Sequence, residues 1–235
     1  MCGRFTLRAP ASVIAEQFAL FELPLLRARF NIAPTQDVPV VRVRPGDSGA
    51  TDTPARRELV ALRWGLVPSW AKEPGIGNRL INARSETAAE KPAFRSAMKR
   101  HRCLIVADGF YEWQAIGRRK QPMFFYLADD RPFAFAGLWD TWEGADQSAL
   151  ETCTILTTEA SEFVRPVHDR MPVILPEKLY DDWLDPAQHD TKRLLPLLKP
   201  YPSDDLEVYP VSTKVNRPGY DKPDCVERER ELFDE

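Results

Sequence analysis

Short segments with the composition of β-strands run through most of the chain, and they limit the possible folds more than any other feature. β-Branched and aromatic residues are concentrated in these segments, and residues that favour turns separate them. The segments cover residues 37–43, 58–64, 103–106, 110–114, 122–127, 132–139, 152–158 and 171–175. Gly117 favours a hairpin at residues 116–120, and residues 128–131 favour a second hairpin. Such a chain is expected to form a largely antiparallel sheet.

Helical patterns interrupt the strands at a few places. Residues 12–20 carry apolar side chains at helical spacing. Ser85 can cap a helix that starts at the next residue, and Pro92 can open its continuation toward Arg100. A proline also opens the helix predicted over residues 177–184. Short helices among antiparallel strands indicate an α+β fold, with the sheet curled into an open barrel and the helices on its flanks.

The length of 235 residues fits one domain, and 43% hydrophobic residues are enough to build its core. We expect this domain to span residues 1–220, followed by a charged tail over residues 221–235 in which Cys225 is exposed. Residues 44–57 are rich in Pro, Gly, Asp and Thr and are predicted to form an exposed loop. A monomer is expected.

Composition argues against several classes of protein. No run of about 18 apolar residues is present to span a bilayer, and the first residues lack the apolar centre of a secretory signal. A cytoplasmic protein is therefore expected. The four cysteines form no C-x-x-C pair, so we expect no metal site, no disulfide framework and no other cofactor. Cys103 and Cys153 lie in apolar runs and are expected to be buried.

The charge of the chain limits how it can meet nucleic acid. A formal net charge of −3 argues against a protein that coats DNA through its overall charge, so any contact must use a local basic groove. Candidate cations are Arg4, Arg84, Arg95, the run from Lys99 to Arg102 and the run from Arg118 to Lys120. The alternative for most of them is an ordinary solvated surface charge.

Cys2 is the residue with the most specific chemistry. Removal of Met1 would leave a cysteine that carries both a free α-amine and a thiol. Such an aminothiol captures an aldehyde in two steps, because the amine forms an imine and the thiol then closes a five-membered thiazolidine ring. The amine suits this step, since its ordinary pKa of about 7.7–8.0 leaves part of it neutral at physiological pH. A cysteine next to an initiator methionine is otherwise an incidental residue.

Two groups are candidates for proton transfer. Glu112 lies in ADGFYEW, where strand alternation places it opposite Tyr111 and Trp113, and its aromatic neighbours could raise its pKa into the range of a general acid. His168 lies in PVHDRMPVIL beside Asp169, which could orient the ring. The alternatives are an exposed carboxylate on a strand and a histidine that caps a turn.

Other polar and aromatic residues could hold a strand of DNA. Asn82 and Arg84 in INARSET precede a predicted helix start, where they could bind a substrate oxygen and a phosphate, and Arg170 could bind another phosphate. Trp70 and Trp113 offer faces for unstacked bases, whereas Trp64 is expected in the core. Asn82 could instead only stabilise its own turn.

Six blocks of sequence follow one another along the chain: MCGRF, FNIAPTQ, RWGLVPSWAK, INARSET, CLIVADGFYEW and PVHDRMPVIL. Together they resemble the SRAP family, the SOS response-associated peptidases, from Cys2 to Asn216. The resemblance implies a single barrel-like domain that binds single-stranded DNA and forms a thiazolidine crosslink with an abasic site, which protects the lesion. Residues 44–57 and those after Asn216 match no family motif.

The resemblance also implies roles for individual residues. Cys2 is the implied nucleophile, Asn82 positions the reacting end, and Glu112 and His168 transfer protons. The implied DNA-binding residues are Arg4, Trp70, Arg84, Trp113 and Arg170.

Two other functions remain open. Cys2, His168 and Asn82 could form the Cys-His-Asn set of a cysteine peptidase with an N-terminal nucleophile, whose activity would include removal of Met1. Alternatively, the tryptophans and arginines could bind single strands without chemistry, in complexes that salt dissociates.

Overall fold

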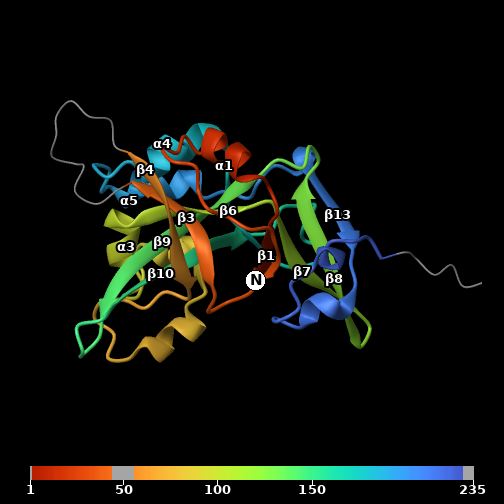
Figure 1. Ribbon diagram of the computed structural model, residues 1–235, viewed down its shortest axis with the longest axis horizontal. Coiled ribbons are helices and arrows are strands. Elements are labelled where there is room, and N and C mark those ends of the chain that lie inside the picture. Colours follow the sequence, from red (N-terminus) through yellow and green to blue (C-terminus); the bar gives the residue numbers. More distant parts are fainter. Residues whose placement is uncertain (1, 44–55, 230–235) are drawn as a thin grey trace, which may run out of the picture.

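The computed structural model describes residues 2–43 and 56–229, and five of its strands close into a barrel (Figure 1). The barrel strands are β3 (Asp37–Val43), β4 (Arg57–Trp64), β6 (Arg102–Ala107), β9 (Phe133–Glu143) and β10 (Ala149–Glu159). They follow one another in the order β10, β4, β3, β6 and β9, and pairing of β9 with β10 closes the ring. Only the β10–β4 contact within this ring is parallel. The α+β class and the barrel are confirmed, and the barrel is closed where we expected it to be open.

A second, five-stranded sheet lies beside the barrel (Figure 1). Its order is β13 (Leu206–Pro210), β8 (Arg119–Leu127), β7 (Gly109–Ile116), β1 (Arg4–Leu7) and β2 (Arg29–Ile32). All four pairings are antiparallel. Strand β1 therefore lies inside this sheet, which fixes the start of the chain between β7 and β2.

One predicted hairpin is confirmed and the other is wrong. Ile116 pairs with Arg119, and Gly117 between them has a φ of 57°, which glycine adopts without strain. The turn at residues 128–131 does not join a hairpin, because β8 pairs with β7 and β13 whereas β9 pairs with β6, β10 and β12 (Ile174–Leu175). That turn carries the chain from one sheet to the other.

An aromatic core joins the two sheets. The ring of Phe5 in β1 lies 5.3 Å from that of Trp64 in β4 and 5.7 Å from that of Phe135 in β9. Burial of a side chain of this size stabilises a fold by about 1.5–3 kcal/mol. Trp64 is fully buried and donates a hydrogen bond to the backbone oxygen of Ile81, so its predicted core position is confirmed.

The predicted helices are present, but they are short. They are α1 (Ala11–Gln17), α2 (Ser85–Ala88), α3 (Arg95–Arg100) and α4 (Tyr180–Leu184), with a further helix, α5 (Thr191–Leu194). Ser85 is the first residue of α2 and makes no capping hydrogen bond, so its predicted role as the cap is wrong. None of the helices in the described ranges is long and apolar enough to cross a membrane.

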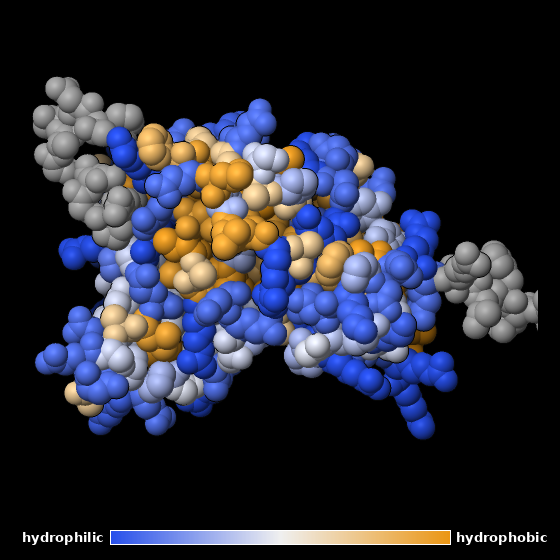
Figure 2. Space-filling view, viewed as in Figure 1, coloured by the Kyte–Doolittle hydropathy of each residue, from blue (hydrophilic) through white to orange (hydrophobic). Residues whose placement is uncertain are grey.

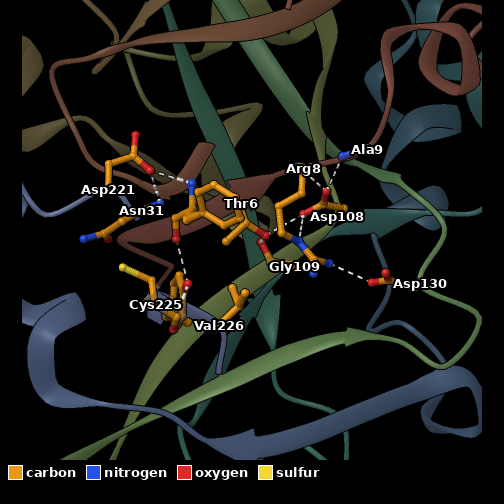
Figure 3. Close-up of polar contacts among 12 residues, drawn as sticks. Thr6, Arg8, Ala9, Asn31, Asp108, Gly109, Asp130, Asp221, Cys225 and Val226 are labelled. Carbon is orange, nitrogen blue, oxygen red and sulfur yellow. Dashed lines mark hydrogen bonds and ion pairs between the residues drawn. The ribbon is translucent and has the colours of Figure 1, made fainter. Parts of the chain in front are cut away.

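A buried carboxylate, that of Asp108, fixes the end of β1 in place (Figure 3). Asp108 is 1% exposed and accepts hydrogen bonds from the Thr6 hydroxyl at 2.6 Å, from the backbone N–H of Arg8 and from that of Ala9 at 2.8 Å. The guanidinium of Arg8 also pairs with Asp108. These bonds satisfy the backbone where β1 ends, and they set the direction in which its other end projects.

The chain remains packed beyond residue 220. Asp221 accepts hydrogen bonds from the backbone N–H groups of Phe30 and Asn31 (Figure 3), and Glu229 donates one to the oxygen of Pro210. Cys225 is fully buried, so its predicted exposure is wrong. The prediction failed because charged neighbours in sequence do not show that the thiol packs into the fold. The rest of the predicted tail and most of the predicted loop 44–57 lie outside the described residues.

A few large apolar side chains lie outside the core. Between α1 and β2, Phe21, Leu23 and Leu25 are 75%, 70% and 103% exposed. Figure 2 shows apolar side chains gathered near the centre of the face that carries β3 and β4.

Candidate functional site around Cys2

Cys2 lies two residues before the first residue of β1 and is fully buried. Its Sγ lies 3.8 Å from the backbone oxygen of Arg4. Arg4 pairs with Tyr111 across the β1–β7 ladder, so the residues just before β1 come level with Glu112. Burial and then the negative charge of Glu112 raise the pKa of the Cys2 thiol well above its usual range. The thiol is therefore neutral in this environment.

Asn82 connects the amino-terminal segment to the barrel. It lies in β5 (Asn82–Arg84), a short strand that pairs in parallel with β10. Its Nδ2 donates a hydrogen bond to the backbone oxygen of Cys2 at 2.8 Å. Its Oδ1 is buried and accepts no hydrogen bond from the residues that the structure describes. A buried acceptor without a donor favours a ligand that carries a hydroxyl or an amine.

Glu112 is a buried carboxyl on β7, and only 2% of it is exposed. Tyr111 points to the other side of the sheet and packs on Phe124, so the predicted alternation is confirmed. Burial raises the pKa of Glu112 to about 7, and the charge of Asp169 acts in the same direction. A group with this pKa can both give and take a proton near neutral pH.

His168 lies in the loop before β11 (Arg170–Pro172). Its Nδ1 accepts a hydrogen bond from the backbone N–H of Arg170 at 2.9 Å and lies 2.9 Å from the carboxylate of Asp169. Burial lowers the pKa of His168, although Asp169 opposes this effect. The backbone amide of Arg170 can only donate, so the Nδ1 of His168 must offer a lone pair. The proton of the neutral imidazole ring therefore lies on Nε2.

Lys120 was grouped with surface cations in the sequence, and its position near the proton-transfer groups was not predicted. Its charge lowers the pKa of both Glu112 and His168. Because the charge of Lys120 on β8 acts on both groups, Glu112 and His168 lie near each other. Nothing in the local sequence distinguishes Lys120 from Arg118 and Arg119, which precede it.

The three predicted phosphate-binding arginines differ in their surroundings. Arg4 donates to the backbone oxygen of Val215 at 2.5 Å and to the Oδ1 of Asn31 at 3.0 Å. Arg170 makes a bidentate pair with Glu86, at 2.6 and 3.0 Å. Arg84 is exposed and forms no ion pair within residues 2–43 and 56–229. Arg84 is therefore the most available of the three for an incoming phosphate.

The tryptophans lie on two sides of this region. Trp70 is 60% exposed, which confirms its predicted surface position. It lines a groove of about 450 Å³ together with Asn82, Arg84 and Phe94. Trp113 donates a hydrogen bond from Nε1 to the Oδ1 of Asn216 at 2.7 Å. A base or sugar in the groove beside Trp70 would reach the amide that contacts Cys2.

The structure thus brings Cys2, Asn82 and Glu112 together, with the His168 loop beside Glu112; we call these four residues the Cys2 site. No cluster of three or more His, Cys, Asp or Glu side chains suited to a metal occurs within the described ranges. Cys103 and Cys153 are buried in the barrel, as predicted.

Comparisons with known proteins agree with this geometry. The chain is 42% identical over 231 residues to the abasic site processing protein YoqW of Bacillus subtilis, with 97% of this chain and 99% of that protein covered. It is 35% identical to the abasic site processing protein HMCES of Gallus gallus, with 85% of this chain and 66% of that protein covered.

Solved structures share the fold. A crystal structure of a protein from Bacteroides thetaiotaomicron superposes with a TM-score of 0.84 at 24% identity and covers 97% of this chain and 100% of that chain. A protein from Bordetella bronchiseptica superposes with a TM-score of 0.74 at 29% identity, covering 90% of this chain and 100% of that chain. The family model for the SOS response associated peptidases matches residues 1–218. The chain therefore belongs to the SRAP family.

Proposed function

We propose that the protein binds single-stranded DNA and links itself covalently to abasic sites through the amine and thiol of Cys2, once Met1 has been removed. The observation that carries the proposal is the buried carboxyl of Glu112, with a pKa of about 7, beside the Cys2 thiol. The names of the relatives, abasic site processing proteins, supply the substrate.

The first step opens the sugar. An abasic deoxyribose exists mostly as a closed hemiacetal, which has no free aldehyde. At neutral pH about half of Glu112 carries a proton, because its pKa is about 7. Glu112 gives its proton to the ring oxygen as the hemiacetal C–O bond breaks, and the resulting carboxylate takes the proton of the anomeric hydroxyl, so the aldehyde forms and Glu112 is protonated again.

The second step joins the amine to the sugar. The lone pair of the Cys2 amine attacks the aldehyde carbon and gives a carbinolamine. Its hydroxyl leaves as water after receiving a proton from Glu112 or His168, and an imine remains. The Oδ1 of Asn82 could hold the carbinolamine hydroxyl, since that buried oxygen has no donor from the described part of the chain.

The third step closes the ring. The Cys2 thiol is neutral at rest, so it needs a base before it can attack. Glu112, now a carboxylate, takes the thiol proton as the new C–S bond forms and passes it to the imine nitrogen, which becomes a secondary amine. The product is a thiazolidine, and the reverse sequence releases it.

A cysteine peptidase is the alternative activity. In a Cys-His-Asn set the asparagine orients the histidine, but here the Nδ2 of Asn82 donates to the oxygen of Cys2. The Nδ1 of His168 instead accepts from the backbone N–H of Arg170. Steady turnover of an added peptide by the purified protein would favour this alternative.

The test is denaturing electrophoresis with three oligonucleotides: an intact single strand, an abasic single strand and an abasic duplex. Only the abasic single strand should give a product that resists SDS. Cys2→Ala should abolish the product while retaining affinity for intact single strands. Glu112→Gln should slow both formation and reversal, by about 100-fold or more if it is the main proton donor. An undiminished product with Cys2→Ala would refute the proposal.

A further inference from the structure

A row of unpaired cations lies on and before α3. Lys91, Arg95, Lys99 and Arg100 are all exposed, and none of them forms an ion pair with a carboxylate in the described part of the chain. Arg95 and Lys99 are four residues apart in α3 and share one face, about 6 Å apart along the axis. Lys91 lies in the turn before α3, where its backbone oxygen accepts a hydrogen bond from the N–H of Arg95. The cations therefore gather at the start and along one side of α3.

The last cation of the predicted basic run has a different role. Arg102 is buried and donates to the backbone oxygens of Lys99, Trp183 and Asp185. It closes the end of α3 and joins it to α4. This contrast shows that the fold uses one cation of the run for its own stability and leaves Lys99 and Arg100 toward solvent.

The exposed cations face a groove that continues from the Cys2 site. A groove of about 680 Å³ is lined by Ser69 and Trp70 on one side and by Arg95, Lys99 and Arg100 on the other. Trp70 and Pro92 also line the groove that contains Asn82 and Arg84. The two grooves therefore meet at the exposed ring of Trp70.

The loop that carries Trp70 is held rigidly. The backbone N–H of Ser69 donates to the carboxylate of Asp140 at 3.0 Å, and the indole N–H of Trp142 donates to the oxygen of Ala71 at 2.7 Å. Earlier in the same loop, the backbone N–H of Val67 donates to the hydroxyl of Thr152 at 2.8 Å. An exposed aromatic ring on a fixed loop is a platform on which a base can stack at little entropic cost.

We propose that the α3 groove, lined by Trp70, Arg95, Lys99 and Arg100, is a second DNA-binding segment that holds the nucleotides on one side of the abasic site. The strand would pass over Trp70, and its phosphates would contact the three cations. Interleaved aromatic and basic side chains are typical of grooves that bind single strands without reading their sequence. The inference rests on the proposed function, because the Cys2 site defines where the strand starts.

The test compares Arg95→Gln/Lys99→Gln/Arg100→Gln with the matched control Arg27→Gln/Arg56→Gln/Lys178→Gln. Both variants lose two arginines and one lysine from exposed positions, and the control residues lie outside both grooves. Affinity is measured by fluorescence anisotropy against salt, on single strands that carry an unreactive tetrahydrofuran analogue of the abasic site and are extended from it on the 5′ side only or on the 3′ side only. Circular dichroism and thermal unfolding establish that both variants are folded.

The α3 variant should lose affinity for only one of the two kinds of strand, either the 5′-extended or the 3′-extended one. It should bind the other kind with the affinity of the parent. Three lost phosphate contacts should reduce the magnitude of the slope of log K against log salt concentration by about 2. The affinity of the parent relative to that of the variant should therefore be about 100-fold greater at 0.1 M salt than at 1 M. The control should keep the parent slope. An unchanged slope, an equal loss in the control or an equal loss on both sides would overturn the inference.

Crosslinking separates this inference from the proposed function. On a short abasic oligonucleotide with one nucleotide on each side, the α3 variant should crosslink as fast as the parent. If the parent itself forms no SDS-resistant product, the proposed function fails, while the anisotropy on the tetrahydrofuran strands still decides whether the α3 groove binds DNA. A slower rate on the short oligonucleotide would place the three cations at the reaction itself and would also overturn the inference.

Discussion

Asn82 donates a hydrogen bond from its Nδ2 to the backbone oxygen of Cys2 at 2.8 Å, across 80 residues of sequence. This bond ties β5, and through it β10 of the barrel, to the residue that precedes β1. The position of the amine and thiol in the proposed reaction therefore depends on a strand far away in the chain.

Loss of this bond should slow the reaction without unfolding the protein. A hydrogen bond of this kind contributes about 0.5–1.5 kcal/mol, so Asn82→Ala should reduce the single-turnover crosslinking rate by about 10-fold. Anisotropy with intact single strands should show affinity within about 3-fold of the parent. A parent-like crosslinking rate would show that the Asn82–Cys2 bond does not position the reacting end.

The serine variant of Cys2 should separate the two covalent steps. Cys2→Ser keeps the α-amine but replaces the thiol with a much weaker nucleophile. It should still form an imine with an abasic strand, detectable only after trapping with borohydride. The parent product should survive SDS without any reductant. A stable product from Cys2→Ser without borohydride would rule out ring closure by the thiol.

Glu112 should make stability depend on pH. Its pKa is about 7 in the fold and 4.5 in the unfolded chain, so the carboxyl is neutral in both states below about pH 4.5 and the full stability is present there. Between about pH 4.5 and pH 7 the carboxyl ionises in the unfolded chain but stays protonated in the fold, so the free energy of unfolding falls by about 3 kcal/mol and levels off above pH 7. Urea unfolding at pH 5 and pH 8 should show this loss in the parent and a smaller one in Glu112→Gln. Equal losses would place the titration elsewhere.

Asp108 should be important for stability. Its buried carboxylate accepts hydrogen bonds from the backbone N–H groups of Arg8 and Ala9. Asp108→Ala therefore leaves these donors without acceptors. The free energy of unfolding should fall by about 3 kcal/mol or more, measured by urea denaturation. Asp129→Ala is the matched control, because that carboxylate is 54% exposed and should change stability by less than about 1 kcal/mol.

Two glycines near the loop of Trp70, Gly75 and Gly77, allow a paired test of what supports that loop. A Cβ on Gly77 would lie 2.5 Å from the backbone oxygen of Gly65, whereas a Cβ on Gly75 would meet nothing within 4 Å. Gly77→Ala should therefore destabilise the protein by about 1–3 kcal/mol and weaken binding of single strands, while Gly75→Ala should do neither. Thermal unfolding and anisotropy measure the two effects. Equal behaviour of both variants would show that this close approach does not support the loop.

The sequence predicted those elements whose signals are local. The hairpin at Gly117 was predicted because a turn residue lies between two strands that pair with each other. The turn at residues 128–131 carries the same kind of signal, yet β8 and β9 pair with distant strands instead. Strand pairing is a long-range property, and turn composition does not determine it.

Short strands with mixed composition were not predicted. Strand β1 contains Arg4 and Thr6 among its four residues, and its pairing depends on Asp108 and on β7. The burial of Cys225 was missed for the same reason, since its neighbours in sequence are polar.

The candidate site was identified through motifs, and spacing alone would not have assembled it. Cys2 and Glu112 are far apart in sequence, and only the β1–β7 ladder brings them level. The raised pKa of Glu112 was expected from aromatic neighbours, and burial is its main cause. The proximity of Lys120 could not be predicted, because it depends on how β8 lies relative to the loop of His168.

The place of Cys2 at the start of β1 has a consequence for synthesis of the protein. Cys2 is translated long before Asn82, which donates a hydrogen bond to it, and before Glu112, which exchanges protons with it in the proposed reaction. A nascent chain therefore carries an aminothiol that lacks its proton donor until β5 and β7 have joined the fold. For the same reason, an affinity tag placed ahead of Cys2 would remove the free amine, and a tag after the last residue would preserve it.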